Sequence, residues 1–247
     1  MITNDLIILI PSFNEEENLP DILYEIVKII PRENILLADD GSTDNTIEIA
    51  KEYQIKIIKS KSNVGKGYIL KNAFESIIKY FPHINWIITL DADGQHNPRD
   101  IVSFLKSIDK DKNVCIFIGR RDFKEMPKFN YLSNFSTSKW CKFWLQWELN
   151  DLQCGYRCYN TKRLKQLLYY GLSKKHFDFE SEILFVAWLL DMKLKEVPIQ
   201  TVYFFHHRES RILPSLDTLR WIWLVITFGL NSQFLRKILL RKGYIHS

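Results

Sequence analysis

The chain has 247 residues, of which 46% are hydrophobic and 26% charged, and both fractions are ordinary for a soluble globular protein. Its 9 glycines and 8 prolines are too few for a disordered, collagen-like or linker-dominated chain. Residues 206–247 contain seven basic and two acidic side chains, so they carry the whole net charge of +5. This basic end, which includes Trp221 and Trp223, suggests an anionic partner, either phospholipid or nucleic acid.

The first half of the chain alternates short apolar runs with amphipathic stretches. The apolar runs are rich in β-branched residues, which predicts buried strands at residues 6–10, 34–38, 55–58, 86–90 and 114–119. The stretches between them have helical spacing, which predicts helices at residues 19–30, 43–53, 67–80 and 98–108. Strands that alternate with helices predict an α/β fold, with a mostly parallel central sheet flanked by helices.

After residue 119 the pattern changes. We expect a charged loop over residues 120–134, an aromatic helix at 135–149, a strand at 153–159, a buried helix at 179–190 and strand character at 195–205. Residues 214–247 are expected to form one or two amphipathic helices. The sequence contains no internal repeat and no low-complexity segment.

Four cysteines are too few for a disulfide scaffold in a chain of this length. Cys154 and Cys158 are four residues apart, but they lack the second Cys or His pair of a zinc site. We therefore expect buried thiols in a reducing compartment. The apolar run at residues 6–10 is too short for a secretory signal, so we expect a catalytic body that is cytoplasmic or faces the cytoplasm.

Acidic residues follow three of the predicted strands, at the edge where an open parallel sheet binds its ligands. The three segments are residues 11–15 (PSFNE), 39–42 (DDGS) and 91–96 (DADGQH). Carboxylates that meet at one edge need a cation or hydrogen-bond donors between them. Asp91 and Asp93 lie two residues apart and Gln95 adds an amide carbonyl, so this turn is a candidate site for Mg²⁺ or Mn²⁺.

Two competing motifs fail on spacing. An EF-hand loop counted from Asp91 has His96 where glycine is required and Val102 where glutamate is required. Residues 65–67 begin a dinucleotide-binding fingerprint, but Leu70 stands at the position of its third glycine. Neither a calcium loop nor a dinucleotide site is predicted.

Four segments together resemble family 2 glycosyltransferases, in the nucleotide-sugar-binding half of the GT-A fold. They are residues 10–15 (IPSFNE), 39–44 (DDGSTD), 63–67 (NVGKG) and 91–96 (DADGQH). Residues 119–121 (GRR), 153–157 (QCGYR), 179–182 (FESE) and 196–199 (EVPI) are similar to the polyprenyl-phosphate branch, which includes dolichyl-phosphate mannose synthases. The resemblance covers residues 6–211, although family members often have Thr at the place of Cys154 and Phe at that of Tyr156.

The resemblance implies which residues bind the nucleoside-diphosphate sugar donor. They are Pro11, Phe13, Asn14, Glu15, Asp39, Asp40, Asp91 and Ala92, together with Arg208 and Arg211 from a segment that closes over the donor phosphates. Pro11 and Asn14 also suit a simple strand-to-helix turn, and Asp39 and Asp40 also suit a helix N-terminus. Lys66 could face the pyrophosphate, but a single surface lysine is usually only solvated.

The resemblance also implies an acceptor side. Arg121 and Arg157 are assigned to acceptor binding, because a guanidinium matches a phosphate group, while a surface salt bridge remains the alternative for Arg121. Asp93, Glu182 and Arg157 are the expected catalytic residues, and Asp91, Asp93 and Gln95 the expected metal ligands.

The implied reaction is an inverting transfer in one displacement, assisted at the departing nucleoside diphosphate by the metal. A polyprenyl (dolichyl or undecaprenyl) phosphate acceptor needs no general base because it arrives largely ionised, whereas a hydroxyl acceptor does. The alternatives are a hydroxyl acceptor in cell-surface polysaccharide or glycolipid synthesis, and a non-catalytic nucleotide- or lipid-binding module. The identity of the sugar, the identity of the nucleotide base (guanine or uracil) and the oligomeric state are left open.

We expect a glycosyltransferase domain at residues 1–211 and a basic amphipathic tail at 212–247. The apolar stretch at residues 219–230 is shorter than the roughly 20 residues of a membrane span. Its aromatic residues alternate with aliphatic ones, which favours an anionic membrane surface over nucleic acid. We therefore expect peripheral or monotopic binding to the cytoplasmic face of a membrane, with packing against the body or a second subunit as the alternative.

Overall fold

The computed structural model describes residues 4–121, 139, 142, 149–169 and 178–200. Seven strands form one sheet in the order β3-β2-β1-β4-β6-β5-β7. The strands are β1 (Leu6–Ser12), β2 (Ile35–Asp39), β3 (Lys56–Lys59), β4 (Trp86–Thr89), β5 (Ile116–Arg120), β6 (Arg157–Asn160) and β7 (Leu194–Pro198). Only β6 runs antiparallel to its neighbours, which are β4 and β5, and the other four pairings are parallel.

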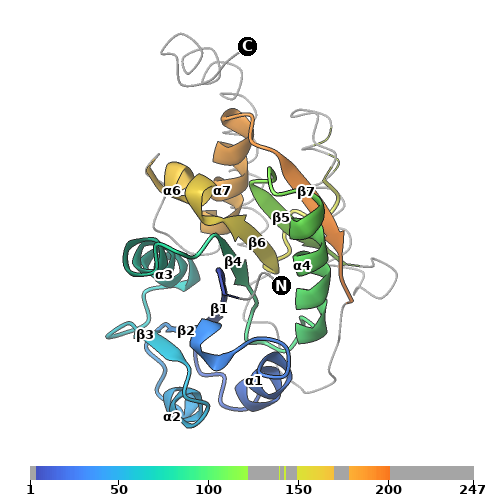
Figure 1. Cartoon of the computed structure of the whole chain (residues 1–247). Helices are drawn as coiled ribbons and strands as arrows, with labels where there is room; N and C mark the ends of the chain where they lie inside the picture. Colours follow the sequence, from blue (N-terminus) through green and yellow to red (C-terminus); the bar gives the residue numbers. More distant parts are fainter. Residues whose placement is uncertain (1–3, 122–138, 140–141, 143–148, 170–177, 201–247) are drawn as a thin grey trace.

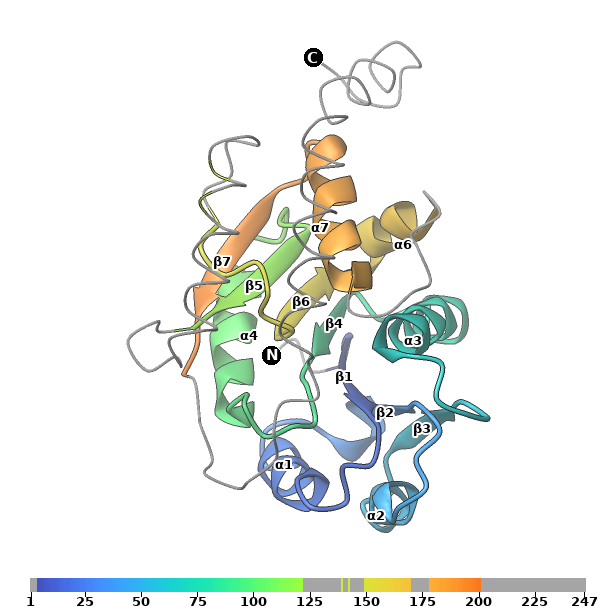
Figure 2. The same ribbon diagram turned by 180° about the vertical axis from the view of Figure 1, so that it is seen from behind.

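Helices cover both faces of this sheet (Figure 1). They are α1 (Leu19–Ile26), α2 (Thr46–Glu52), α3 (Lys66–Tyr80), α4 (Ile101–Lys110), α6 (Thr161–Tyr169) and α7 (Asp178–Leu189), with single 3₁₀ turns at Arg32–Asn34 and Pro98–Asp100. The helices α3, α6 and α7 lie together on one face, and α1 and α4 lie on the other, as the reverse view also shows (Figure 2). The predicted α/β fold is confirmed.

The position of the hydrophobic core follows from the helices that cover both faces of the sheet. All residues of β1, β2 and β4 are buried, because helices pack on both of their faces, and this explains why these strands are almost uniformly apolar. From one side, α3 contributes Phe74, whose ring lies 5.1 Å from that of Tyr159 in β6 and 6.2 Å from that of Phe179 in α7. This aromatic group joins three elements that are distant in the sequence.

The predicted elements agree with the structure in the first half of the chain and differ in detail after it. The predicted helix at residues 98–108 begins as a 3₁₀ turn and continues as α4. The short strand β6 occupies only the end of the predicted run at 153–159, and α6 was not predicted. The predicted helix at 135–149 falls mostly outside the described residues, and residues 201–247, including the predicted tail, fall wholly outside them.

Among the described residues, no helix is both long enough and apolar enough to cross a membrane.

Replacement of Phe74 tests the aromatic group that joins α3, β6 and α7. Because Phe74 is fully buried, Phe74→Ala should lower the free energy of unfolding by about 3–5 kcal/mol in urea titrations followed by circular dichroism. Tyr80→Ala is the matched control on the same helix, since Tyr80 is 64% exposed, and it should cost less than about 1 kcal/mol. Equal losses for the two variants would contradict this packing.

Candidate active site

The turn after β1 is hydrogen-bonded to the turn after β2. The backbone N–H of Asn14 donates to Ser42 Oγ (2.9 Å), and Asn14 Oδ1 accepts from the backbone N–H of Thr43 (2.8 Å). The backbone N–H of Glu15 donates to Thr46 Oγ1 (2.8 Å). Asn14 adopts a left-handed conformation with φ of 54°, which asparagine tolerates better than most residues. The two turns therefore form one rigid rim at the carboxyl edge of the sheet.

Asp39, the last residue of β2, has one carboxylate oxygen in use and one available. Its Oδ2 accepts from the backbone N–H groups of Gly41 (3.1 Å) and Ser42 (3.0 Å). Its Oδ1 is buried and has no hydrogen-bond partner among the described residues. A buried carboxylate oxygen is costly to leave unpaired, so Asp39 is well suited to accept a hydrogen bond from a ligand.

Asp40 differs from its neighbour because both of its carboxylate oxygens are occupied. Oδ1 accepts from the backbone N–H of Val64 (2.8 Å) and Oδ2 from that of Gly65 (2.9 Å). Burial raises the pKa of Asp40, and these two hydrogen bonds partly offset that rise. Asp40 thus holds the loop that leads into α3 at the same edge as Asp39.

The turn after β4 carries the predicted metal ligands. Asp91 lies two residues after the end of β4, and Asp93 and Gln95 are exposed at the rim. The backbone N–H of Gln95 donates to Asp93 Oδ1 (3.0 Å). Although Asp93 has an exposed surface, the protein around its carboxyl group partly desolvates it and raises its pKa, and the nearby Asp91 carboxylate raises the pKa further. The two aspartates are therefore close enough to repel each other.

Lys66, the first residue of α3, lies between two carboxylates. Its Nζ is 2.7 Å from Asp91 Oδ1 and 3.0 Å from Glu180 Oε2 in the first turn of α7. Burial works against the charged form of both Asp91 and Lys66, but the attraction outweighs it, so the pKa of Asp91 is lowered and that of Lys66 is raised. Lys66 thus contacts both carboxylates, and the three side chains form the electrostatic centre of the rim.

His96 is a buried residue that stabilises the turn after β4. Its side chain is buried, its Nδ1 accepts from the backbone N–H of Asp91 (3.3 Å), and its Nε2 faces Cys154 Sγ at 3.9 Å. The ring of His96 packs on that of Tyr156, with centroids 5.0 Å apart. Burial lowers the pKa of His96 and favours the neutral ring. His96 therefore fixes the backbone at the start of the turn.

The absence of a side chain at Gly155 leaves room for Asp91 and Lys66. A Cβ atom at this position would lie 2.5 Å from Asp91 Oδ2 and 3.2 Å from Lys66 Nζ. The carbonyl of Gly155 accepts from Thr89 Oγ1 (2.8 Å), which fixes the backbone against the end of β4. A side chain at residue 155 would thus displace Asp91.

Arg157 lies under the rim rather than on it. Its side chain is 1% exposed, and its three nitrogens donate to the carbonyls of Cys154 (2.7 Å), Glu180 (2.5 Å) and Leu152 (2.8 Å). The guanidinium therefore joins the segment before β6 to the first turn of α7.

Arg121 makes a bidentate ion pair with Asp151, which is fully buried. Its Nε and Nη2 donate to Asp151 Oδ2 (2.8 Å) and Oδ1 (2.9 Å), and its backbone N–H also donates to Oδ2 (3.2 Å). The side chain of Arg121 remains 17% exposed. The structure therefore contains a salt bridge, which is the alternative that the sequence left open for Arg121. This ion pair holds residues 121 and 151 together.

The other predicted residues have the following places. Pro11 lies within β1 and Ala92 follows Asp91, and both are buried, whereas Phe13 and Glu182 are partly exposed. Arg208 and Arg211 lie outside the described residues. Sequence reasoning did not place Lys66 or Gly155 in the site, although both belong to segments that carried the family resemblance.

The residues at the rim fit a divalent metal only in part. The described residues contain no group of three or more Asp, Glu, His or Cys side chains that could hold an ion. Asp91 and Asp93 supply two oxygen donors, which suits Mg²⁺ or Mn²⁺ when substrate phosphates complete the coordination. His96 is not available as a ligand, since its two nitrogens face Asp91 N and Cys154 Sγ.

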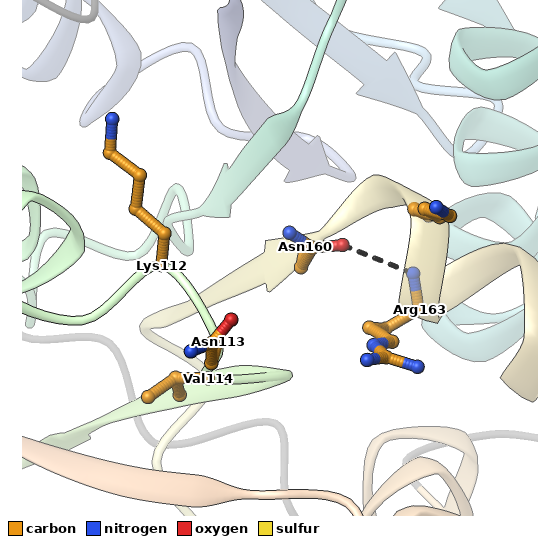
Figure 3. A pocket seen from close by; sticks show the side chains of 6 residues that line it. Lys112, Asn113, Val114, Asn160 and Arg163 are labelled. Carbon is orange, nitrogen blue, oxygen red and sulfur yellow. Dashed lines mark hydrogen bonds between the residues drawn. The ribbon is translucent and has the colours of Figure 1, made fainter.

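A separate hollow lies at the opposite edge of the sheet, between the segment before β5 and the start of α6 (Figure 3). It is lined by Lys112, Asn113, Val114, Asn160, Lys162 and Arg163. The side chain of Asn160 accepts from the backbone N–H of Arg163 (3.1 Å) and so caps α6. This hollow shares no residue with the acidic rim.

Substitution of Gly155 tests the crowding around Asp91. The added methyl of Gly155→Ala should separate Asp91 from Lys66 and lower the free energy of unfolding by about 1–3 kcal/mol, the usual cost of overpacking. Urea titration measures the loss. A crystal structure of the variant in which Asp91 and Lys66 keep their contact would contradict the prediction.

The architecture is shared with a protein of known structure. The structure of glucosyl-3-phosphoglycerate synthase from Mycobacterium tuberculosis, solved with Mn²⁺, UDP-glucose and phosphoglyceric acid, superposes with a TM-score of 0.69. The match covers 91% of this chain and 79% of that one at 13% sequence identity, so it shows a common fold.

Sequence comparison identifies nearer relatives. An uncharacterised protein of Methanocaldococcus jannaschii is 31% identical over 205 residues, which are 81% of this chain and 82% of that protein. The UDP-N-acetylglucosamine–dolichyl-phosphate N-acetylglucosaminyltransferase of Methanococcus voltae is 29% identical over 221 residues, with 79% and 85% covered. The model of glycosyl transferase family 2 matches residues 7–168, more than half of the chain. The resemblance seen in the sequence is thus confirmed, and this chain belongs to glycosyl transferase family 2.

Proposed function

We propose that the protein transfers a sugar from a nucleoside-diphosphate sugar to a polyprenyl phosphate, with inversion at the anomeric carbon. The observation that carries the proposal is the meeting of Asp39, Asp91 and Asp93 at the carboxyl edge of the sheet, where open α/β sheets bind their ligands. The relative from Methanococcus voltae, which is named for transfer to dolichyl phosphate, supports the choice of acceptor.

The nucleoside is assigned to the joined turns after β1 and β2. Asp39 Oδ1, buried and without a partner among the described residues, would accept a hydrogen bond from the base or the ribose. Pro11, Phe13, Asn14 and Glu15 would frame the nucleoside. Asp40 contributes indirectly, because its two carboxylate oxygens hold residues 64 and 65 in place.

The diphosphate is assigned to the turn after β4. Asp91 and Asp93 would hold Mg²⁺ or Mn²⁺, with Gln95 as a further oxygen donor, and Mn²⁺ is present in the superposed synthase structure. When bound, such an ion neutralises the charge that develops on the departing nucleoside diphosphate. Arg208 and Arg211 are proposed to reach the same phosphates.

The acceptor is assigned to the side of the rim that β6 and α7 form. A phosphate monoester is largely ionised at neutral pH and can attack without a general base. Glu182, partly exposed in α7, would serve as the base for a hydroxyl acceptor, which is the alternative reaction. Arg121 is proposed to attract the acceptor phosphate, while the contacts of Arg157 favour a positioning role for a residue first assigned to direct binding.

The acceptor lipid implies a membrane surface. We propose that residues 212–247 form a basic amphipathic tail that binds the anionic cytoplasmic face of a membrane, and that residues 1–211 form the catalytic domain. Arg236, Lys237, Arg241 and Lys242 would contact lipid phosphates, and the aromatic residues of the tail would lie at the headgroup level.

A panel of nucleotide sugars, each with radiolabelled polyprenyl phosphate and Mg²⁺ or Mn²⁺, tests the reaction. We expect one sugar to be transferred and expect Asp93→Asn to lower the rate by at least about a hundredfold, because a metal ligand is lost. Asp109→Asn, a change of the same type at an exposed position in α4, should leave the rate unchanged.

Three outcomes would each contradict a part of the proposal. Full transfer in the presence of excess chelator would show that no metal takes part. Reaction of the sugar donor, by hydrolysis or transfer, only when a hydroxyl acceptor is supplied would favour the alternative acceptor. Nucleotide binding without any turnover would favour a non-catalytic binding module.

Vesicle sedimentation tests the membrane proposal. The full chain should bind vesicles that contain anionic lipid, and binding should weaken as salt rises, since the tail charges are screened beyond about 8 Å at physiological ionic strength. Replacement of Arg236, Lys237, Arg241 and Lys242 by Ser should release the protein. Equal binding to neutral and anionic vesicles would contradict an electrostatic role for the tail.

A further inference from the structure

We infer that Lys66 is a built-in counterion that occupies Asp91 until a divalent metal takes its place, so that Lys66 and the metal compete for this carboxylate. The inference rests on the proposed metal site at Asp91 and Asp93. It assigns to Lys66 a positioning role that neither the family match nor the relatives' names describe.

The first observation is that Asp91 already has a cation beside it and little room to move toward Gly155. Oδ1 is 2.7 Å from Lys66 Nζ, and Oδ2 lies so close to the backbone of Gly155 that a Cβ atom there would be 2.5 Å away. A metal that binds Asp91 therefore brings a second positive charge next to Lys66 Nζ, so that either the carboxylate or Lys66 must move away. The backbone of Gly155 is fixed by its hydrogen bond with Thr89, whereas a lysine side chain has several rotatable bonds. Lys66 is therefore the neighbour that can move away from Asp91.

The second observation is that Lys66 has another carboxylate to hold it. Its Nζ is also 3.0 Å from Glu180 Oε2, and the side chain of Glu180 is only 10% exposed. The backbone carbonyl of Glu180 is fixed in turn by Arg157 Nη1 (2.5 Å). When Lys66 gives up Asp91, it can therefore remain in the site, paired with Glu180.

The third observation is that local helix electrostatics do not explain Lys66. It is the first residue of α3, and a positive side chain is unfavourable at the N-terminus of a helix. The two carboxylates offset that cost. Without Lys66, Asp91 and Glu180 would both lose the ammonium group that pairs with them, so the rim would be less stable in the absence of metal.

Binding of Mn²⁺ alone, measured by calorimetry on the full-length protein, tests the competition. Lys66→Met removes the ammonium and keeps much of the side-chain volume, so Mn²⁺ should bind about tenfold more tightly, within the usual range for coupled sites. The melting temperature without metal should fall, and its rise on addition of Mn²⁺ should exceed that of the parent. Lys61→Met is the matched control: Lys61 is an exposed lysine of the preceding loop, and its loss should change neither quantity.

A second variant separates competition from a change in total charge. Lys66→Met combined with Glu180→Gln removes one charge of each sign, so the net charge is that of the parent while Asp91 loses its partner. This protein should also bind Mn²⁺ more tightly than the parent, and it decides the question if Lys66→Met alone does not fold. Unchanged or weaker Mn²⁺ binding in the folded variants would overturn the inference.

Asp91→Asn distinguishes this failure from failure of the metal site itself. If Asp91→Asn abolishes Mn²⁺ binding but the Lys66 variants match the parent, the metal site stands and the competition does not. If Asp91→Asn binds Mn²⁺ as the parent does, or if no protein of the series binds it with or without a nucleoside diphosphate, the proposed metal site is wrong and the inference fails with it.

Discussion

The repulsion between carboxylates at one edge of the sheet is the constraint around which the described part of the molecule is arranged. Parallel strands bring Asp39, Asp91 and Asp93 to the same rim, and each of the first two is stabilised in a different way. Asp39 accepts from the backbone of the turn that follows it, whereas Asp91 pairs with the ammonium of Lys66. Asp93, exposed and close to Asp91, is left with a raised pKa.

The nucleotide-binding half could be predicted because its signals are local. Its strands are short apolar runs, its helices have regular spacing, and its polar residues follow directly after strands, so position in the sequence gives position in the fold. Asp39 and Asp40 mark the limit of this reasoning. They are adjacent and identical, and only the structure distinguishes the carboxylate with a buried oxygen free for a ligand from the one that holds the loop of Val64 and Gly65.

The second half was harder to predict because its contacts join distant segments. The strand β6 has four residues and lies between β4 and β5 in the opposite direction, a placement that no local pattern specifies. Arg157 shows the same difficulty. The match between a guanidinium and a phosphate group suggested a phosphate ligand. The buried side chain instead donates to three carbonyls from two separate segments, which makes it part of the framework. The missed helix α6 has leucines at helical spacing but spans only 9 residues, so its pattern is short in the sequence.

The antiparallel strand also explains how the two sides of the site can influence each other. Because β6 lies next to β4, the segment before it brings Gly155 against Asp91 and brings Arg157 under the first turn of α7. Glu180 in that turn is then held twice, by Arg157 at its backbone carbonyl and by Lys66 at its carboxylate. A change in the partner of Lys66 on the donor side must alter the charge that Glu180 sees on the acceptor side. A parallel strand at this place would need a crossover connection and would not deliver Gly155 and Arg157 to the same edge within three residues.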